Sequence, residues 1–404
     1  MGALDEMLVA SPVEEVVCAD CLEHMRTMPS DLVDAVITDP PYGLSFMGAD
    51  WDSYGGRNGT ESIEERRRKG QEYEGSNAVV PRFGNSHGKR PKVDEMVAFQ
   101  QAMTPIFEEA LRVAKPGAHL LCFGGTRTYH RITCAIEEAG WVIKDCIMWV
   151  YGSGMPHGQR VDRLMEKRYP NAAPEWEGWN TQLKPAWEPI VVAYKPFKGG
   201  VAKNALLNGT GAMNIDACRV PTDEDISTHG DGASDQKSAS VYGSYKGDRP
   251  RKSKGQEIGR YPANLIHDGS EEVREQFPDA KGQQGDLRAG IPKRTGVCYG
   301  DFPPTKEYAK RDELDTSAAR FFYCAKASKK DRGEGNDHTT VKPTALMEWL
   351  VTLVTREDSL VLDPFAGSGT TLVAAKRLGR EFIGIERDPH YCDIARSRLD
   401  KEGE

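Results

Sequence analysis

Apolar and polar residues follow one another along the chain in blocks that predict alternating strands and helices. Between residues 15 and 38, two apolar runs flank a short segment with helical spacing, which predicts a strand, a helix and a strand. From Val93 apolar residues recur every three or four positions, which predicts an amphipathic helix closed by Pro116 and Gly117. Patterns for a strand, a helix and a strand follow over residues 118–151. This alternation is typical of βα units on a largely parallel sheet.

The same pattern returns in the last part of the chain. It predicts a helix at 344–356, strands at 359–363 and 381–386, a helix between these strands and a helix at the end. We therefore expect one doubly wound, Rossmann-like α/β sheet that is built from both ends of the chain, by residues 1–152 and 338–404.

Two long segments lack this periodicity. Residues 44–92 are rich in Gly, Arg and Glu, and such a length of irregular chain inside a compact domain predicts a flexible loop or an active-site lid. Residues 153–337 are rich in Gly, Pro, Lys, Trp and Tyr, with short strand patterns such as "EPIVVAY" and little helical periodicity. We interpret this second segment as an inserted region.

Composition narrows the class of protein. The chain has 404 residues, of which 38% are hydrophobic and 28% charged, and none of its apolar runs approaches the roughly 18 residues of a membrane span. The acidic N-terminal stretch does not resemble a signal peptide, and nine cysteines without framework spacing favour a reducing compartment, so we expect a cytoplasmic protein. The pair Cys18 and Cys21 is expected in the core, without a metal. The net charge of −8 does not mark a nucleic-acid binder, although basic residues can gather locally.

The motif "DPPY" places an acid rigidly at the end of a strand. The apolar run that ends at Ile37 leads directly to Asp39, which is followed by Pro40, Pro41 and Tyr42. Proline fixes φ and cannot continue a hydrogen-bonded ladder in the middle of a sheet. The carboxylate and the neighbouring carbonyl groups are therefore held in one arrangement.

The stretch "LDPFAGSGTTL" has the form of a nucleotide-binding loop. A strand ends at Asp363, glycines follow at 367 and 369, and Ser368 is expected to cap the next helix. Glu386, which is 19 residues beyond Gly367, has about the spacing of an acid that binds ribose hydroxyls in a Rossmann unit. Leu372 occupies the third glycine position of G-x-G-x-x-G, which argues against a dehydrogenase, and no P-loop string occurs.

The order of these two motifs resembles the β class of S-adenosylmethionine-dependent DNA amino-methyltransferases. "DPPY" comes first, a long region follows, and "DPFAGSGTT" comes last. "NDHTTVKPTALMEWLV" resembles the family's motif just upstream of the cofactor loop, and "LKPAWEPIVVAYKP" resembles a segment of phage-type members. The resemblance implies a methyltransferase fold with circularly permuted motif order, in which residues 153–337 form the target-recognition region. The loops that carry Asp39 and Asp363 should then meet at the carboxyl edge of one sheet.

The resemblance also implies the chemistry of the first motif. An exocyclic amino nitrogen is a poor nucleophile because its lone pair is delocalised into the base. Asp39 and the carbonyl of Pro40 can accept hydrogen bonds from this amino group and stabilise the positive charge that grows on it, with Pro41 fixing the backbone. Tyr42 offers a face for stacking, and the target base has to be flipped out of the duplex.

Cofactor contacts are implied on the carboxyl side of several strands. The resemblance places Asp20 beside the adenine of S-adenosylmethionine, Glu386 on its ribose, and Thr340 and Lys342 near its carboxylate. Asp20 as a helix cap and Lys342 as a solvated surface lysine are the alternative interpretations. The remaining expected contacts are Asp363, Pro364, Phe365, Ala366, Gly367, Ser368, Gly369, Thr370, Thr371 and Arg387.

Two groups of residues are candidates for contact with DNA. Trp149 and Tyr151 resemble a wall of the target-base pocket, and their alternative is a core position. A second group mixes tyrosines with basic residues, which suits stacking and phosphate contact, and its alternative is a solvated loop. Its members are Tyr242, Tyr245, Lys246, Arg249, Arg251, Lys252 and Lys254.

Adenine N6 is the favoured target atom, because the resemblance links Asp at the first motif position mainly with adenine. Cytosine N4, an RNA substrate and a catalytically idle DNA-binding protein remain alternatives. The expected partner is double-stranded DNA. A homodimer is also expected, because members of the family that the chain resembles often form dimers. No restriction-nuclease motif is evident, which favours a solitary modification enzyme.

Overall fold

The computed structural model describes residues 13–43, 93–222, 259–280, 317–325 and 331–402, apart from residues 155, 157, 167, 332, 334 and 339. The predicted loop at 44–92 and the predicted basic segment that begins at Tyr242 lie outside the described residues. None of the described helices is both long enough and apolar enough to cross a membrane.

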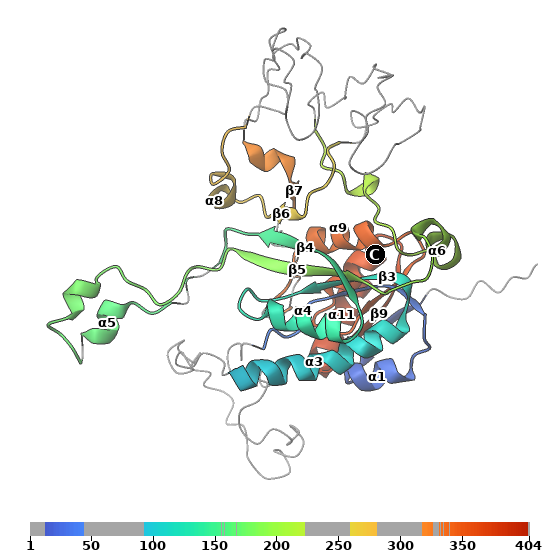
Figure 1. Ribbon diagram of the computed structural model, residues 1–404, viewed down its shortest axis with the longest axis horizontal. Coiled ribbons are helices and arrows are strands. Elements are labelled where there is room, and N and C mark those ends of the chain that lie inside the picture. Colours follow the sequence, from blue (N-terminus) through green and yellow to red (C-terminus); the bar gives the residue numbers. More distant parts are fainter. Residues whose placement is uncertain are drawn as a thin grey trace, which may run out of the picture.

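A single nine-stranded mixed sheet forms the centre of the described chain (Figure 1). Its strands, in spatial order, are β1 (Glu14–Cys18), β9 (Glu381–Glu386), β8 (Leu360–Asp363), β2 (Val33–Thr38), β3 (Ala114–Phe123), β5 (Trp187–Tyr194), β4 (Val142–Val150), β6 (Leu265–His267) and β7 (Tyr323–Cys324). The first five are parallel to one another, and β5 is antiparallel to both β3 and β4. The expected α/β sheet built from both ends of the chain is therefore confirmed.

Helices cover both faces of the sheet, as in a doubly wound fold. On one face lie α1 (Cys21–Thr27), α3 (Val93–Val113) and α4 (Tyr129–Glu138), and on the other lie α9 (Thr344–Val354), α10 (Thr370–Arg377) and α11 (Pro389–Lys401). The first face buries Met25, Phe99 and Ile136 in one core cluster, and the second buries Leu350 and Leu372 in another. The inner strands β8, β2 and β3 are thus buried on both sides, which explains their continuous apolar runs.

The boundary expected at residue 152 does not divide the sheet. Strand β5 lies inside the predicted inserted region, yet it pairs with β3 from His119↔Tyr194 to Phe123↔Ile190. Strands β6 and β7 extend the same sheet. The sequence pattern missed this because a strand that arrives after a long irregular segment carries no local sign of its neighbours.

Two element ends differ from the expectations. Helix α3 ends at Val113 and β3 begins at the next residue, so Pro116 and Gly117 lie within the strand instead of closing the helix. Helix α10 takes Gly369 as its N-cap, without a hydrogen bond from a capping side chain, so the expected cap at Ser368 is wrong. Gly369 has φ +80, a conformation that glycine adopts without strain.

Other described parts of the inserted region lie outside the sheet. An arm with α5 (Val161–Met165) and the 3-10 turn Ala173–Trp176 projects to the left in Figure 1, while α8 (Glu271–Arg274) lies to the left of β6. Helix α6 (Val201–Asn208) follows the carboxyl-terminal end of β5. Short 3-10 turns occur at Asp216–Cys218 and Ala318–Phe321.

Candidate active site

Four neighbouring parallel strands each deliver an acid to the same edge of the sheet. Glu386 and Asp363 are the last residues of β9 and β8, Asp39 directly follows β2, and Asp20 lies two residues beyond β1. Because the strands are parallel, their carboxyl ends meet at one edge, where open α/β sheets bind ligands. The Oγ1 atom of Thr38 donates a hydrogen bond to Oδ1 of Asp363 at 2.7 Å. The predicted meeting of the two motif loops is therefore confirmed.

Asp363 holds the glycine loop together. Besides Thr38, its carboxylate accepts hydrogen bonds from the backbone N–H of Phe365 at 3.1 Å and from the hydroxyl of Thr371 at 2.6 Å. The side chain is buried, and burial raises the pKa of Asp363 to about 6 despite these donors. The carboxylate thus joins the first turn of α10 to the ends of β8 and β2.

The glycine loop lies against a neighbouring segment that leaves no room for side chains. Gly367 has φ +51, and a Cβ there would lie 2.9 Å from Nε2 of His338. A Cβ at Gly369 would lie 2.9 Å from Cβ of Ala395. His338, in the segment "NDHTTVKP", therefore lies against Gly367, and Ala395 of α11 lies against Gly369.

Glu386 binds the same loop from the next strand. Its Oε2 accepts a hydrogen bond from the N–H of Gly367 at 2.9 Å, and its Oε1 accepts one from the N–H of Asp388 at 2.8 Å. Burial raises the pKa of Glu386 above its ordinary value. The neighbouring Arg387 is exposed. A carboxylate with free lone pairs beside a glycine loop can also accept hydrogen bonds from ribose hydroxyls.

The other expected cofactor residues lie at this edge too. Asp20 caps α1 through hydrogen bonds from the N–H groups of Leu22 and Glu23, so its alternative role as a cap is confirmed, and contact with a cofactor stays a prediction. Thr340 is exposed, and its N–H donates to Nδ1 of His338 at 3.3 Å. Within the described residues, no acceptor is within reach of the buried Nδ2 of Asn336. The open loop, the acids and this free donor fit S-adenosylmethionine.

Asp39 is the centre of a partly buried polar cluster. Its Oδ1 accepts a hydrogen bond from the hydroxyl of Tyr42 at 2.8 Å, and its Oδ2 pairs with Nζ of Lys342 at 2.7 Å. Lys342 is 8% exposed, so its interpretation as a solvated surface lysine is wrong. Pro40 is buried and Pro41 is half-buried, which fixes the turn that carries the carboxylate.

Glu188 completes this cluster and was not expected from the sequence. Its Oε2 lies 3.0 Å from Nζ of Lys342 and 3.1 Å from the hydroxyl oxygen of Tyr42, whose single hydrogen is shared between Glu188 and Asp39. Burial and the two neighbouring carboxylates raise the pKa of Tyr42 well above 10.0, so the hydroxyl stays protonated. The only sequence signal was an acid directly before Pro189 in a strand pattern, a place where proline limits the ladder.

The two aromatic candidates from β4 occupy different surroundings. Trp149 is 9% exposed and belongs to the core of the second face, whereas Tyr151 is half-buried, and their ring centroids are 5.0 Å apart. Burial and a hydrogen bond to Glu188 raise the pKa of Tyr151 to about 12. Tyr151 therefore borders the Asp39 cluster, and a contact of either ring with a base stays a prediction.

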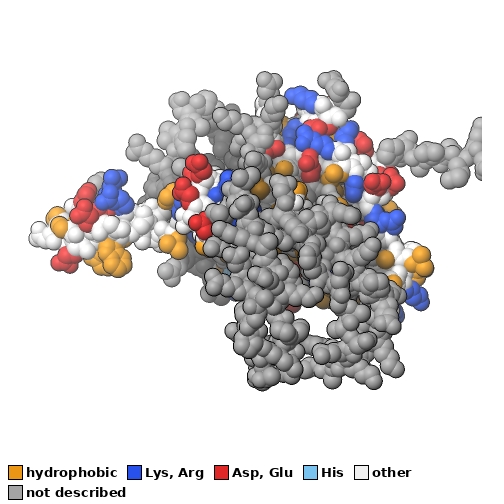
Figure 2. All heavy atoms as spheres, turned by 90° about the horizontal axis from the view of Figure 1, so that it is seen from above, with side chains coloured by type: hydrophobic (Ala, Val, Ile, Leu, Met, Phe, Trp, Pro, Cys, Tyr) orange, Lys and Arg blue, Asp and Glu red, His pale blue; other side chains and the backbone are white. Residues whose placement is uncertain are grey.

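Charges are mixed on the part of the surface that the structure describes. Figure 2 shows basic and acidic side chains intermingled there, together with apolar side chains on the projecting arm. The arm exposes Leu164, Tyr169, Trp179 and Leu183. The expected basic DNA contacts, from Tyr242 to Lys254, lie outside the described residues.

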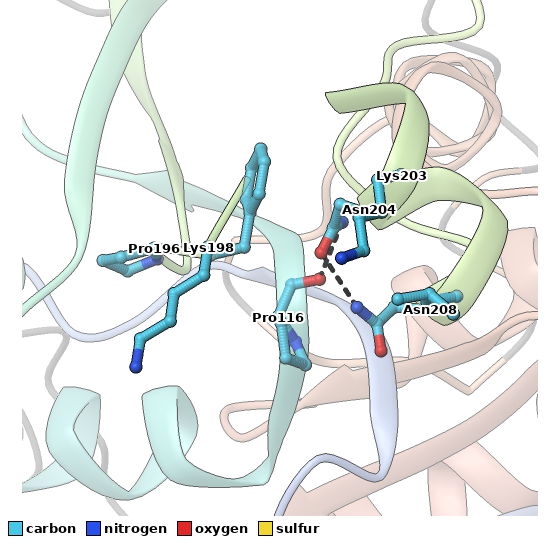
Figure 3. Close-up of a pocket in the computed structure, with 8 residues that line it drawn as sticks. Pro116, Pro196, Lys198, Lys203, Asn204 and Asn208 are labelled. Carbon is cyan, nitrogen blue, oxygen red and sulfur yellow. Dashed lines mark hydrogen bonds between the residues drawn. The ribbon is translucent and has the colours of Figure 1, made fainter. Parts of the chain in front are cut away.

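A groove of about 330 Å³ lies around Pro116 and helix α6 (Figure 3). It is formed around Pro116, at the amino-terminal end of β3, and by α6, so it is at the opposite edge from the acids. Asn204 donates hydrogen bonds from its Nδ2 to the carbonyls of Pro116 at 3.0 Å and Thr210 at 2.9 Å. The groove is thus a packing feature of this connection.

The family model described as DNA methylase matches residues 33–397. The chain belongs to this family of N6/N4 DNA methyltransferases, and the resemblance seen in its motifs is confirmed. The methyl donor of the family is S-adenosylmethionine, and its substrate is DNA.

The individual relatives are similar either over most of the chain at low sequence identity or over a short segment at higher identity. The type II methyltransferase M.HindIII of Haemophilus influenzae is 26% identical over 394 residues, which are 94% of this chain and 93% of the relative. The type II methyltransferase M2.DpnII of Streptococcus pneumoniae is 49% identical over 77 residues, or 19% of this chain and 29% of the relative. Among solved structures, the complex of M1.HpyAVI with S-adenosylmethionine has a TM-score of 0.40 at 17% identity, with 96% of this chain and 98% of that chain covered. The cytosine-N4-specific PvuII DNA methyltransferase has a TM-score of 0.43 at 14% identity, with 96% and 86% covered.

Proposed function

We propose that the protein transfers a methyl group from S-adenosylmethionine to the N6 amino group of adenine in double-stranded DNA, at a specific site and after flipping the base out of the duplex. The observation that carries this proposal is the hydrogen bond between Thr38, next to Asp39, and Asp363. It joins the acceptor for an amino group to the loop expected to hold the methyl donor. An Asp at the first motif position favours adenine.

The cofactor side of the proposed site consists of Asp20, Glu386, the loop from Asp363 to Gly369 and the segment around Thr340. Asp363 keeps the loop in place through its three hydrogen bonds, while the Glu386 carboxylate, which accepts from the N–H groups of Gly367 and Asp388, keeps lone pairs for ribose hydroxyls. Bound there, S-adenosylmethionine supplies an electrophilic methyl group on a sulfonium.

On the catalytic side, the roles of the residues follow from electrostatics. Asp39 and the carbonyl of Pro40 accept hydrogen bonds from the amino group of the flipped base, which localises the nitrogen lone pair. The same oxygens stabilise the positive charge that develops on nitrogen, as preorganised dipoles do in other active sites. Because the prolines fix the turn, little reorganisation is needed when the base arrives.

The test is a mass analysis of nucleosides in DNA from cells with and without the protein. We expect N6-methyladenine only when the wild-type protein is present, and at least about 100-fold less methylation by purified Asp39→Ala, because one preorganised acceptor is lost. Asp393→Ala is the control, since Asp393 is exposed on α11 with Arg396 as its partner. Normal methylation by Asp39→Ala would overturn the mechanism.

Other outcomes separate the alternatives. Detection of N4-methylcytosine instead of N6-methyladenine would show that the target base is cytosine, with Asp39 in the same role. Methylated RNA without methylated DNA would overturn the choice of substrate. DNA binding without any methylated nucleoside would indicate a catalytically idle protein.

A further inference from the structure

The ammonium group of Lys342 is fully engaged on the catalytic side of the site. Its Nζ lies 2.7 Å from Oδ2 of Asp39, 3.0 Å from Oε2 of Glu188 and 3.2 Å from the hydroxyl oxygen of Tyr42. An ammonium group has three N–H donors, so these oxygens account for all of them. A contact with the carboxylate end of the cofactor would require that one of them be given up.

Lys342 is held as a cation in this position. Burial works to lower the pKa of Lys342, but the charges of Asp39 and Glu188 outweigh burial and raise the pKa above its ordinary value. The Nζ also lies 4.9 Å from the ring centroid of Phe123 and 5.6 Å from that of Tyr42, where aromatic faces favour a cation. The lysine therefore remains charged at any pH at which the enzyme works.

Glu188 changes the balance of charge around Asp39. With Lys342 alone, the Asp39 carboxylate would belong to a neutral ion pair and would stabilise a growing positive charge poorly. The second carboxylate leaves one net negative charge on the cluster of Asp39, Glu188 and Lys342. It also gives the ammonium group a partner when the amino group of a base competes for Asp39.

We propose that Lys342 and Glu188 are positioning residues for Asp39. Lys342 holds the Asp39 carboxylate in one orientation through the ion pair at Oδ2, and Glu188 holds Lys342 in place and balances its charge. The inference rests on the function proposed above, and it assigns Lys342 to the catalytic carboxylate instead of the cofactor.

Several titratable groups face this cluster from the surrounding elements. Asp39 and Tyr42 come from the loop after β2, Glu188 from β5, Tyr151 from the end of β4, Cys122 from β3 and Asp363 from β8. Burial raises the pKa values of Tyr42, Tyr151 and Cys122, so these groups stay neutral near pH 7. Changes at Lys342 or Glu188 therefore act mainly on the carboxylates.

The test uses Lys342→Met and Glu188→Gln in the purified full chain, with bacterial DNA that lacks methylated bases and with isotopically labelled S-adenosylmethionine. We expect kcat to fall roughly 10- to 100-fold in both variants, the effect of one charge-assisted hydrogen bond. The KM for the cofactor and its Kd, measured by calorimetry without DNA, should stay within about twofold of wild type.

The two variants should shift the pH dependence of kcat in opposite directions. Lys342→Met leaves two facing carboxylates without their cation, so one of them takes up a proton at a higher pH. The loss of kcat on the acid side of the pH profile, its acid limb, should therefore shift to higher pH. Glu188→Gln removes one of two like charges, so the acid limb moves down. A purely structural role for either residue would lower activity without these opposite shifts.

Matched controls are Lys376→Met and Glu348→Gln, which alter surface residues paired with Glu14 and Arg377 respectively. Lys342→Arg keeps the positive charge, so the acid limb of its pH profile should match that of wild type. If Lys342→Met does not fold, Lys342→Arg and Glu188→Gln are compared instead. A raised Kd for the cofactor with unchanged kcat in Lys342→Met would overturn the assignment, as would unchanged pH profiles. A wild-type protein that methylates no base would instead refute the proposed function itself.

Discussion

At the scale of residues, identical acids at one sheet edge differ in their partners. Asp363 faces hydroxyl and N–H donors from within the fold, whereas Asp39 faces a lysine and a tyrosine. Asp20 is occupied as a helix cap. The sequence could predict that these acids end strands, because each follows an apolar run. It could not predict their partners, because Lys342 and Glu188 approach from remote parts of the chain.

The ionisation of Asp363 should control cofactor binding near pH 6. Above the pKa of about 6, its carboxylate accepts the hydrogen bonds that hold the glycine loop. Below it, the group takes up a proton, one donor loses its acceptor, and a negative charge near the cationic ligand disappears. The affinity for S-adenosylmethionine should therefore fall as the pH is lowered through about 6. Calorimetric titrations between pH 5 and pH 8 measure this.

The stability of the folded chain should respond to the same group with the opposite sign. Because the pKa of folded Asp363 lies above its ordinary value of 3.8, the folded chain binds this proton more tightly than the unfolded chain. This group therefore adds stability as the pH falls from above 6 towards 3.8. In the binding titrations, Asp363→Asn should bind S-adenosylmethionine weakly at every pH, with no fall in affinity near pH 6. The control Asp393→Asn should keep the fall in affinity near pH 6. A fall that persists in Asp363→Asn would show that another group is responsible.

At the scale of elements, the antiparallel strand β5 is what brings Glu188 to the site. In a parallel strand only the last residues reach the carboxyl edge. Strand β5 runs the other way, so its second residue, Glu188, lies at that edge, just before Pro189 and Ile190, which pair with Gly124 and Phe123. The strand itself could be predicted from "EPIVVAY". Its direction and its place between β3 and β4 depend on long-range pairing, which leaves no mark on a local pattern.

Close packing of α10 on the sheet depends on Gly384 in β9. A Cβ at this position would lie 2.3 Å from Cδ1 of the fully buried Leu372. The third glycine that Rossmann loops use for close approach is thus replaced by a glycine on the strand, opposite the leucine. Gly384→Ala should lower the free energy of unfolding by about 1–3 kcal/mol, as overpacked cores do.

The matched control for this change is Gly200→Ala, where a new Cβ meets nothing within 4 Å and φ is negative. We expect it to alter the free energy of unfolding by less than about 0.5 kcal/mol. Denaturant unfolding followed by circular dichroism compares the two variants. Equal midpoints would show that helix α10 does not need the glycine.

At the scale of the whole molecule, the motif order was the most informative feature of the sequence. It predicted the family, while the return of the strand and helix pattern near the end of the chain predicted a sheet assembled from both ends, and β1, β2, β8 and β9 are indeed neighbours. The limits of the inserted region could not be predicted, because β5 to β7 join the sheet from within it. The roles of residues beyond the family pattern, such as Glu188, depend on this assembly.

The central claim is that this assembly methylates adenine in DNA, and one measurement tests it directly. Purified protein is incubated with S-adenosylmethionine that carries a deuterated methyl group and with bacterial DNA free of methylated bases, and the nucleosides are analysed by mass spectrometry. We expect deuterated N6-methyladenine with the wild-type protein and almost none with Asp39→Ala. Label in cytosine, equal label with Asp39→Ala, or no labelled base with the wild-type protein would contradict this claim.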